Sequence, residues 1–197
     1  MVCRSAMGAG HVGFRARLGT WVVLACTTEL IALGVMLCGK PTLLLYNFYW
    51  VVEFGCLYSI AQSMRPMPPL IGVSTGSIFM FLWGANMLVI DPLVEIVHLS
   101  IVIGALTLVG IYLFQLWFIA DKRNEPIWHL PETWVCLAVL VFYGATAPLL
   151  GASNYFVEHD MALALVLDRI STVFFFAKLV LMGVACLKAR ASQLAHV

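Results

Sequence analysis

The sequence predicts an all-α integral membrane protein, a polytopic bundle of six transmembrane helices with both termini in the cytoplasm. Three observations predict this class. Of 197 residues, 62% are hydrophobic and 11% are charged, whereas a soluble domain usually carries about 25% charged residues. The hydrophobic residues form continuous runs of about 20, the length that a helix needs to cross a bilayer. The runs lack the alternation of polarity that strands of a membrane barrel show.

The predicted spans account for most of the chain. They are residues 19–38, 42–63, 69–90, 93–119, 133–153 and 161–187. Together they form a single transmembrane domain, 19–188, with a cytoplasmic N-terminal segment, 1–18, and a cytoplasmic tail, 189–197. The remaining polar segments are too short to fold as a soluble domain. Function is therefore expected among the helices, in short loops or on a partner chain.

Basic residues orient the spans. Cytoplasmic loops of membrane proteins are enriched in Lys and Arg. With a cytoplasmic N-terminus, the outer loops contain only Lys40, and the segments on the inner side contain eight basic residues. These are Arg4, Arg15, Arg17, Arg65, Lys122, Arg123, Lys188 and Arg190. We expect a multi-pass protein of a bacterial inner (plasma) membrane.

The first two spans are predicted to be antiparallel neighbours. The first follows three arginines, as a signal peptide does, but it contains Glu29 and lacks a convincing small-residue cleavage site, so it is expected to be retained. Gly39, Lys40 and Pro41 then predict a tight turn.

One face of the second span is aromatic and acidic. Residues at helical spacing share this face: Tyr46, Tyr49, Trp50, Glu53 and Leu57. The pattern fits an aromatic packing stripe with an interfacial belt. It also fits an aromatic-lined pocket with Glu53 at its floor.

The next three spans each contain distinctive residues. The third begins with small residues at 72–77, which let helices approach closely, and contains Asn86 near its outer end. In the fourth, Glu95 and His98 are three residues apart and share a face, but no third ligand accompanies them, so no metal site is predicted. Pro148 predicts a kink in the fifth.

The sixth span contains three charged residues, Asp168, Arg169 and Lys178. A charge at the bilayer centre costs ~2.5–3.5 kcal/mol on insertion scales. Counting from the outer ends of the spans places Arg169, Glu29 and Glu53 at depths of ~12, ~14 and ~16 Å. We expect Arg169 to pair with one of these carboxylates, because Asp168 projects about 100° away from it. Asp168 is expected to bond Thr172, and Lys178 to extend toward the inner interface.

This network has two interpretations. It either fixes the helix arrangement, or it lines a cavity that is open to the outside and binds a ligand or proton. Intramembrane ionisable residues are functional candidates by default. The predicted network is Glu29, Glu53, Asp168 and Arg169, and the predicted lining is Tyr46, Asn47, Tyr49, Trp50, Asn86, Glu95 and His98.

Other functional classes receive less support. No HExxH, GxSxG or paired-aspartate motif is present, so we predict no enzyme, and we expect no cofactor and no metal. The net charge of +1 predicts no nucleic-acid partner. The leading hypothesis is binding, sensing or transport of a small ligand or protons. The alternative is a non-catalytic structural subunit of a larger membrane complex. The expected partners are the lipid bilayer and other membrane-protein chains, in a homo- or hetero-oligomer.

Two resemblances bear on these hypotheses. LYNFYWVVEF at 45–54, LVEIVHLS at 93–100 and a fifth span that runs from Trp134 to SNYF resemble a family of uncharacterised bacterial multi-pass proteins of about 200 residues. That family implies seven helices and no known activity. VLDRISTVFF at 166–175 resembles the last helix of microbial rhodopsins, but Thr172 occupies the position of the retinal lysine, so retinal is excluded at that site.

Overall fold

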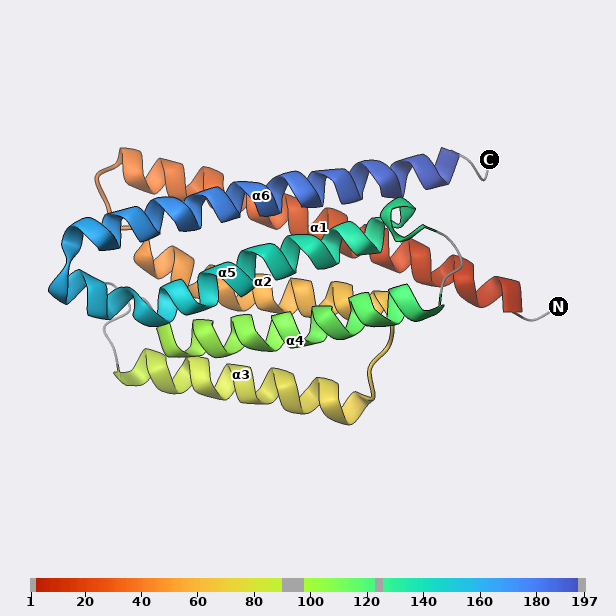
Figure 1. Ribbon diagram of the computed structural model, residues 1–197, viewed down its shortest axis with the longest axis horizontal. Coiled ribbons are helices and arrows are strands. Elements are labelled where there is room, and N and C mark those ends of the chain that lie inside the picture. The colour runs from red at the N-terminus through yellow and green to blue at the C-terminus, as the bar shows by residue number, and fades with distance from the viewer. Residues whose placement is uncertain (1–2, 90–97, 123–125, 195–197) are drawn as a thin grey trace. The chain divides into compact units, whose positions relative to one another are not determined.

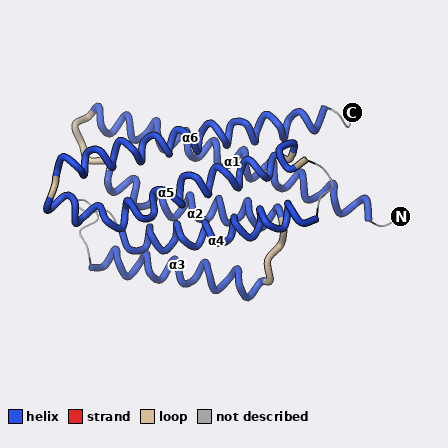
Figure 2. Tube along the Cα trace, viewed as in Figure 1, coloured by secondary structure: helices blue, strands red, loops and turns tan. Residues whose placement is uncertain are grey.

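The computed structural model describes residues 3–89, 98–122 and 126–194. Contacts divide the chain into two compact units, residues 1–104 and 105–197, which are described separately. The described residues form six long α-helices and one short 3-10 helix, and they contain no strand (Figures 1 and 2). The prediction of an all-helical chain is confirmed.

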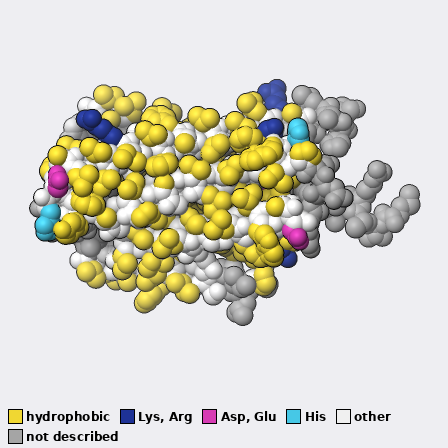
Figure 3. All heavy atoms as spheres, viewed as in Figure 1, with side chains coloured by type: hydrophobic (Ala, Val, Ile, Leu, Met, Phe, Trp, Pro, Cys, Tyr) yellow, Lys and Arg dark blue, Asp and Glu magenta, His cyan; other side chains and the backbone are white. Residues whose placement is uncertain are grey.

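Within the described part of the chain, six helices are long and apolar enough to cross a membrane. The qualifying segments are Gly13–Leu37, Leu43–Met64, Gly72–Val89, Leu99–Asp121, Pro131–Ala152 and Met161–Ala191. On the face drawn in Figure 3, charged side chains lie near the ends of the helices, and hydrophobic side chains cover most of the surface between them. This is the pattern of a multi-pass membrane protein.

Unit 1 begins with an antiparallel helical hairpin. Its helices α1 (Cys3–Leu37) and α2 (Leu43–Met64) are joined at Gly39. Gly39 has a φ of 70°, which glycine adopts without steric cost, so the predicted tight turn is confirmed. The Arg17 guanidinium donates to the backbone carbonyl of Ser59, far from the turn. The two helices therefore run side by side along most of α2.

The helix α1 is longer than the first predicted span. It begins at Cys3, so the described part of the predicted N-terminal segment continues the helix instead of leading up to it. No proline interrupts this stretch. Side chains at spacings of three, four and seven residues are buried along one face of α1: Phe14, Leu18, Trp21, Ala25 and Ala32.

Helix α3 (Pro69–Val89) packs along α2 through aromatic rings. The rings of Phe54 and Phe79 stack with centroids 4.0 Å apart. A β-carbon at Gly72 would collide with the Tyr58 hydroxyl, so a side chain there would require Tyr58 to move. A β-carbon at Gly76 would meet no atom within 4 Å, so the predicted close packing of the small residues is seen at Gly72 and not at Gly76. Gly104, in α4 (His98–Lys122), similarly leaves room for the Phe79 ring.

Unit 2 is built around a second antiparallel hairpin. The 3-10 helix η1 (Ile127–His129) precedes α5 (Pro131–His159), and Asp160 alone separates α5 from α6 (Met161–Leu194). The Asp160 carboxylate accepts a hydrogen bond of 3.0 Å from the Leu163 amide, which caps the start of α6. Helix α5 continues through Pro148 and past the predicted end at residue 153.

Helix α4 also contributes to unit 2. Tyr112 of α4 is fully buried and lies near Cys136 of α5. At the far end from Asp160, the Trp134 indole donates to the carbonyl of Trp128, and the Lys188 ammonium lies 5.7 Å from the Trp134 ring centroid. These contacts fasten η1 to the α5–α6 hairpin.

Candidate functional site

Two carboxyl groups and two phenols meet where α1 lies against α2. Tyr46 of α2 donates a hydrogen bond of 3.3 Å to the Glu29 carboxylate of α1. The Tyr49 hydroxyl lies within hydrogen-bonding reach of the Glu53 carboxyl, and Tyr49 also lies within electrostatic range of Glu29. We call Glu29, Tyr46, Tyr49 and Glu53 the acidic–phenolic cluster.

The local sequence explains this arrangement. Glu53 lies four residues after Tyr49, so the phenol and the carboxyl are one turn apart on the same face of α2. The Gly39 turn reverses the chain and brings Glu29 opposite Tyr46. The cluster therefore depends on helical spacing in α2 and on the register of the α1–α2 hairpin.

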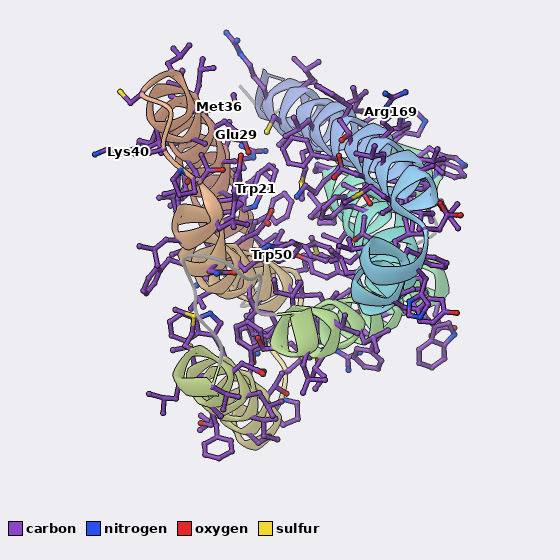
Figure 4. The ribbon with its side chains drawn as sticks, turned by 90° about the vertical axis from the view of Figure 1, so that its left-hand side faces the viewer. Trp21, Glu29, Met36, Lys40, Trp50 and Arg169 are labelled. Carbon is purple, nitrogen blue, oxygen red and sulfur yellow. The ribbon has the colours of Figure 1, made fainter. Side chains whose placement is uncertain are left out.

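The two carboxyl groups have different surroundings. Glu53 is 2% exposed, whereas Glu29 is exposed, and the two tyrosines are half-buried. Figure 4 shows that Glu29 and Trp50 project from the same side of the α1–α2 hairpin, while Lys40 projects from the other. The cluster thus contains a buried carboxyl beside Tyr49 and an exposed carboxyl beside Tyr46.

Two asparagines of the predicted lining lie in unit 1 and take part in different hydrogen bonds. Asn47 is buried, and its backbone carbonyl accepts a hydrogen bond of 3.2 Å from the Trp83 indole of α3. Asn86 is half-buried, and its amide donates to the carbonyl of Leu82 within α3. Glu95 lies outside the described residues, and His98 is the first residue of α4.

The predicted network also included Asp168 and Arg169, which lie on α6 in unit 2. Both are exposed, and Figure 4 shows Arg169 projecting away from the α5–α6 hairpin. The Thr172 hydroxyl bonds the backbone carbonyl of Asp168 at 3.0 Å, as threonines in helices often do, and not the predicted carboxylate. A pairing of Arg169 with Glu29 or Glu53 would be a contact between the two units, so it stays a prediction.

The prediction for Lys178 is wrong. Its side chain is 1% exposed, so it does not extend to an interface. The Lys178 ammonium lies 3.9 Å from the centroid of the Phe142 ring, 5.0 Å from that of Phe175 and 5.5 Å from that of Tyr143. We call these three rings with Lys178 the ammonium–aromatic cluster. Attraction between a cation and the negative face of each ring stabilises it.

The sequence does contain a signal for this second cluster. Phe142 precedes Asp160 by 18 residues, and Lys178 follows it by 18. An antiparallel hairpin that turns at Asp160 therefore places the two at the same level. The predicted spans end at residue 153 and begin again at 161, so this match did not follow from them.

No metal site is evident in the residues described. Among residues 3–89, 98–122 and 126–194, no group of three or more His, Cys, Asp or Glu side chains could hold a metal ion. Cys26, Cys38, Cys56, Cys136 and Cys186 are free thiols.

Comparisons with known proteins do not assign the chain to a family. No protein family model, no curated protein and no solved structure matches the chain. The resemblance to a bacterial multi-pass family stays a prediction.

Proposed function

We propose that this multi-pass membrane protein binds protons or a small cationic ligand at the acidic–phenolic cluster, and senses or transports what it binds. The observation that supports this proposal is the pairing of two carboxyls with two phenols across two membrane-length helices. The protein has no enzymatic role in this proposal. Glu53 forms the buried end of the site, and Glu29 forms the exposed end.

The hydrogen-bonding properties of these groups favour such a ligand. An ionised carboxylate only accepts hydrogen bonds, whereas a protonated carboxyl donates one, and a phenol does both. A protonated Glu53 can donate to the Tyr49 hydroxyl or keep accepting from it through its carbonyl oxygen, so proton binding changes which hydrogen bonds this pair can form. Because Tyr49 also senses the charge of Glu29, a change at one carboxyl reaches the other. A small cation would act similarly by offsetting the repulsion between two carboxylates.

The proposal includes an orientation. We place both termini in the cytoplasm of a bacterium, with the cluster in the outer half of the inner membrane, because basic residues gather on the other side. Reporters fused after Val197 and inserted near Asn124 should be cytoplasmic, and one near Glu158 should be outside. An external C-terminus would contradict this orientation.

A titration tests the binding site directly. Trp50 lies on α2 one turn from Glu53, so its fluorescence should change when the cluster takes up a proton. We expect the purified protein to show a fluorescence transition with pH that the double variant Glu29→Gln, Glu53→Gln has lost. The matched control is Asp121→Asn, an exposed carboxyl in α4, which should keep the transition. A transition that survives in the double variant would refute proton binding at the cluster.

Reconstitution separates transport from sensing. In proteoliposomes that contain a pH-sensitive dye, transport predicts a proton flux that the same double variant abolishes. Sensing predicts the fluorescence transition without a flux.

The second candidate is a structural subunit of a larger membrane complex. The specific observation that favours it is the exposed Asp168–Arg169 pair within a membrane-length helix. A purely structural role predicts that a folded Glu29→Gln, Glu53→Gln variant retains assembly and shows no functional loss.

A further inference from the structure

One face of α6 is exposed along most of its length. Six exposed residues on it follow the heptad spacing of helices that pair along a seam, with the half-buried Leu179 between the last two: Ala162, Leu165, Arg169, Thr172, Phe176 and Gly183. We call this set the α6 stripe. All six residues are exposed, and the two large apolar members, Leu165 and Phe176, are 57% and 60% exposed.

Helix α5 does not cover the α6 stripe. The side of α6 that faces α5 carries the buried residues Lys178, Met182, Ala185 and Ala189. Arg169 precedes Lys178 by nine residues, which corresponds to a rotation of about 180° around the helix. The α6 stripe therefore lies on the side of the helix away from the ammonium–aromatic cluster.

Lipid alone is a poor partner for the α6 stripe. Charged side chains inside a membrane almost always face protein or a wet cavity, because hydrocarbon does not solvate them. Arg169 lies in the middle of the stripe, and Asp168 borders it, both exposed. The two project about 100° apart, so they do not satisfy each other within one helix. A protein surface that covers this face would therefore have to offer both a negative and a positive charge.

A second copy of the same face offers both charges at the right level. A two-fold axis along the bilayer normal places two copies of α6 parallel and at the same depth. Asp168 and Arg169 differ in height by only about 1.5 Å. In a parallel pair of helices, a residue that borders the seam contacts the central residue of the other helix. Each Asp168 then meets the Arg169 of the second copy, and the symmetry forms the ion pair twice.

The other residues of the stripe fit the same arrangement. Ala162, Thr172 and Gly183 are small, and small residues let membrane helices approach closely. Leu165 and Phe176 supply the apolar contacts between them. We propose that the α6 stripe is the interface of a parallel homodimer held by reciprocal Asp168–Arg169 ion pairs. This inference does not depend on the acidic–phenolic cluster.

Reversal of charge tests the reciprocal pairs. In Asp168→Arg, both copies carry two arginines at this level, and in Arg169→Asp, both carry two aspartates. We expect either variant alone to lose co-purification of two differently tagged copies by about tenfold. Co-expression of the two variants should restore it, because a chain with two arginines then meets a chain with two aspartates.

The opposite outcome identifies an intramolecular partner. If Arg169→Asp is rescued by Glu29→Arg or Glu53→Arg in the same chain, and not by co-expression with Asp168→Arg, the partner of Arg169 lies within the chain and the dimer is overturned.

Crosslinking tests the interface without changing either charge. Leu165→Cys lies in the α6 stripe, so two copies should form a disulfide-linked dimer in oxidised membranes, beyond the level of the native cysteines. The matched control is Ile170→Cys, which is also exposed, at 40%, but lies about 140° around the helix from Leu165. Equal crosslinking of the two variants, or none at Leu165→Cys, would contradict a dimer through the α6 stripe.

Discussion

The two hairpins use aromatic residues in opposite ways. In the α1–α2 hairpin, Tyr46 and Tyr49 turn their hydroxyl groups toward carboxyls. In the α5–α6 hairpin, Phe142 offers the face of its ring to the Lys178 ammonium. An aromatic residue can thus accommodate an acidic group through its hydroxyl or a basic group through its π-face. The comparison shows how a chain with few polar residues holds charges of both signs within membrane-length helices.

The largest expected effect comes from reversing the charge at the ammonium–aromatic cluster. Lys178→Glu places a carboxylate against the negative faces of the rings at a fully buried position. We expect it to lower the free energy of unfolding by ~3–5 kcal/mol, as when a buried charge loses its partners. Thermal unfolding of the purified protein in detergent measures this. Lys188→Glu, near the end of α6, is the control and should cost much less, because this lysine is only half-buried.

Removing one ring should give a smaller effect. Phe142→Leu keeps an apolar side chain but removes the π-face closest to the ammonium. We expect a loss of ~2 kcal/mol, the value of a desolvated cation–π contact. The control is Phe81→Leu in α3, because that ring is 73% exposed and lies outside both clusters. Equal losses for the two variants would show that the ring face contributes nothing specific.

At the acidic–phenolic cluster, the informative substitution removes the hydroxyl group of Tyr49. Tyr49→Phe keeps the ring and deletes the hydrogen bond with Glu53. We expect a loss of ~1.5–3 kcal/mol, the value of a hydrogen bond to a charged group. If Tyr49→Phe leaves the melting temperature unchanged, the tyrosine acts by packing alone, and the contrast between the two hairpins fails.

The smallest expected effect comes from the exposed end of the same cluster. Tyr46 donates to Glu29 over a long 3.3 Å, and Glu29 is exposed. We expect Tyr46→Phe to cost ~0.5 kcal/mol, because water replaces much of an exposed hydrogen bond. Chemical denaturation of the two tyrosine variants side by side would show the difference. A larger loss at Tyr46 than at Tyr49 would reverse the assignment of buried and exposed ends.

Most of the fold could be predicted from hydropathy, because a bilayer requires long apolar helices and leaves few alternatives. Helix ends were less predictable. Residues 154–159 are polar enough to suggest a loop, yet they continue α5, since no proline or glycine interrupts them before Asp160. The early start of α1 at Cys3 is also compatible with the sequence, since no proline interrupts residues 3–18, although three glycines lie within them.

The candidate site could be predicted only in part. The shared face of Tyr46, Tyr49 and Glu53 was predicted from helical spacing, and the pairing of α1 with α2 from the turn at Gly39, but the contact of Glu29 with Tyr46 was not predicted. Contacts that depend on the direction of a side chain could not be predicted from the sequence. The depth of Lys178 suggested an extended side chain, whereas the rings of α5 hold its ammonium in place.

The single-residue joint at Asp160 has a consequence for biogenesis. Because only one residue connects α5 to α6, we expect the translocon to release the two helices into the bilayer together, as one helical hairpin. The lysine then enters hydrocarbon already covered by Phe142, and the energetic barrier of a bare ammonium is avoided. Lengthening the joint with a flexible glycine–serine segment should slow membrane integration of α6, and pulse-labelling with protease protection would reveal the delay.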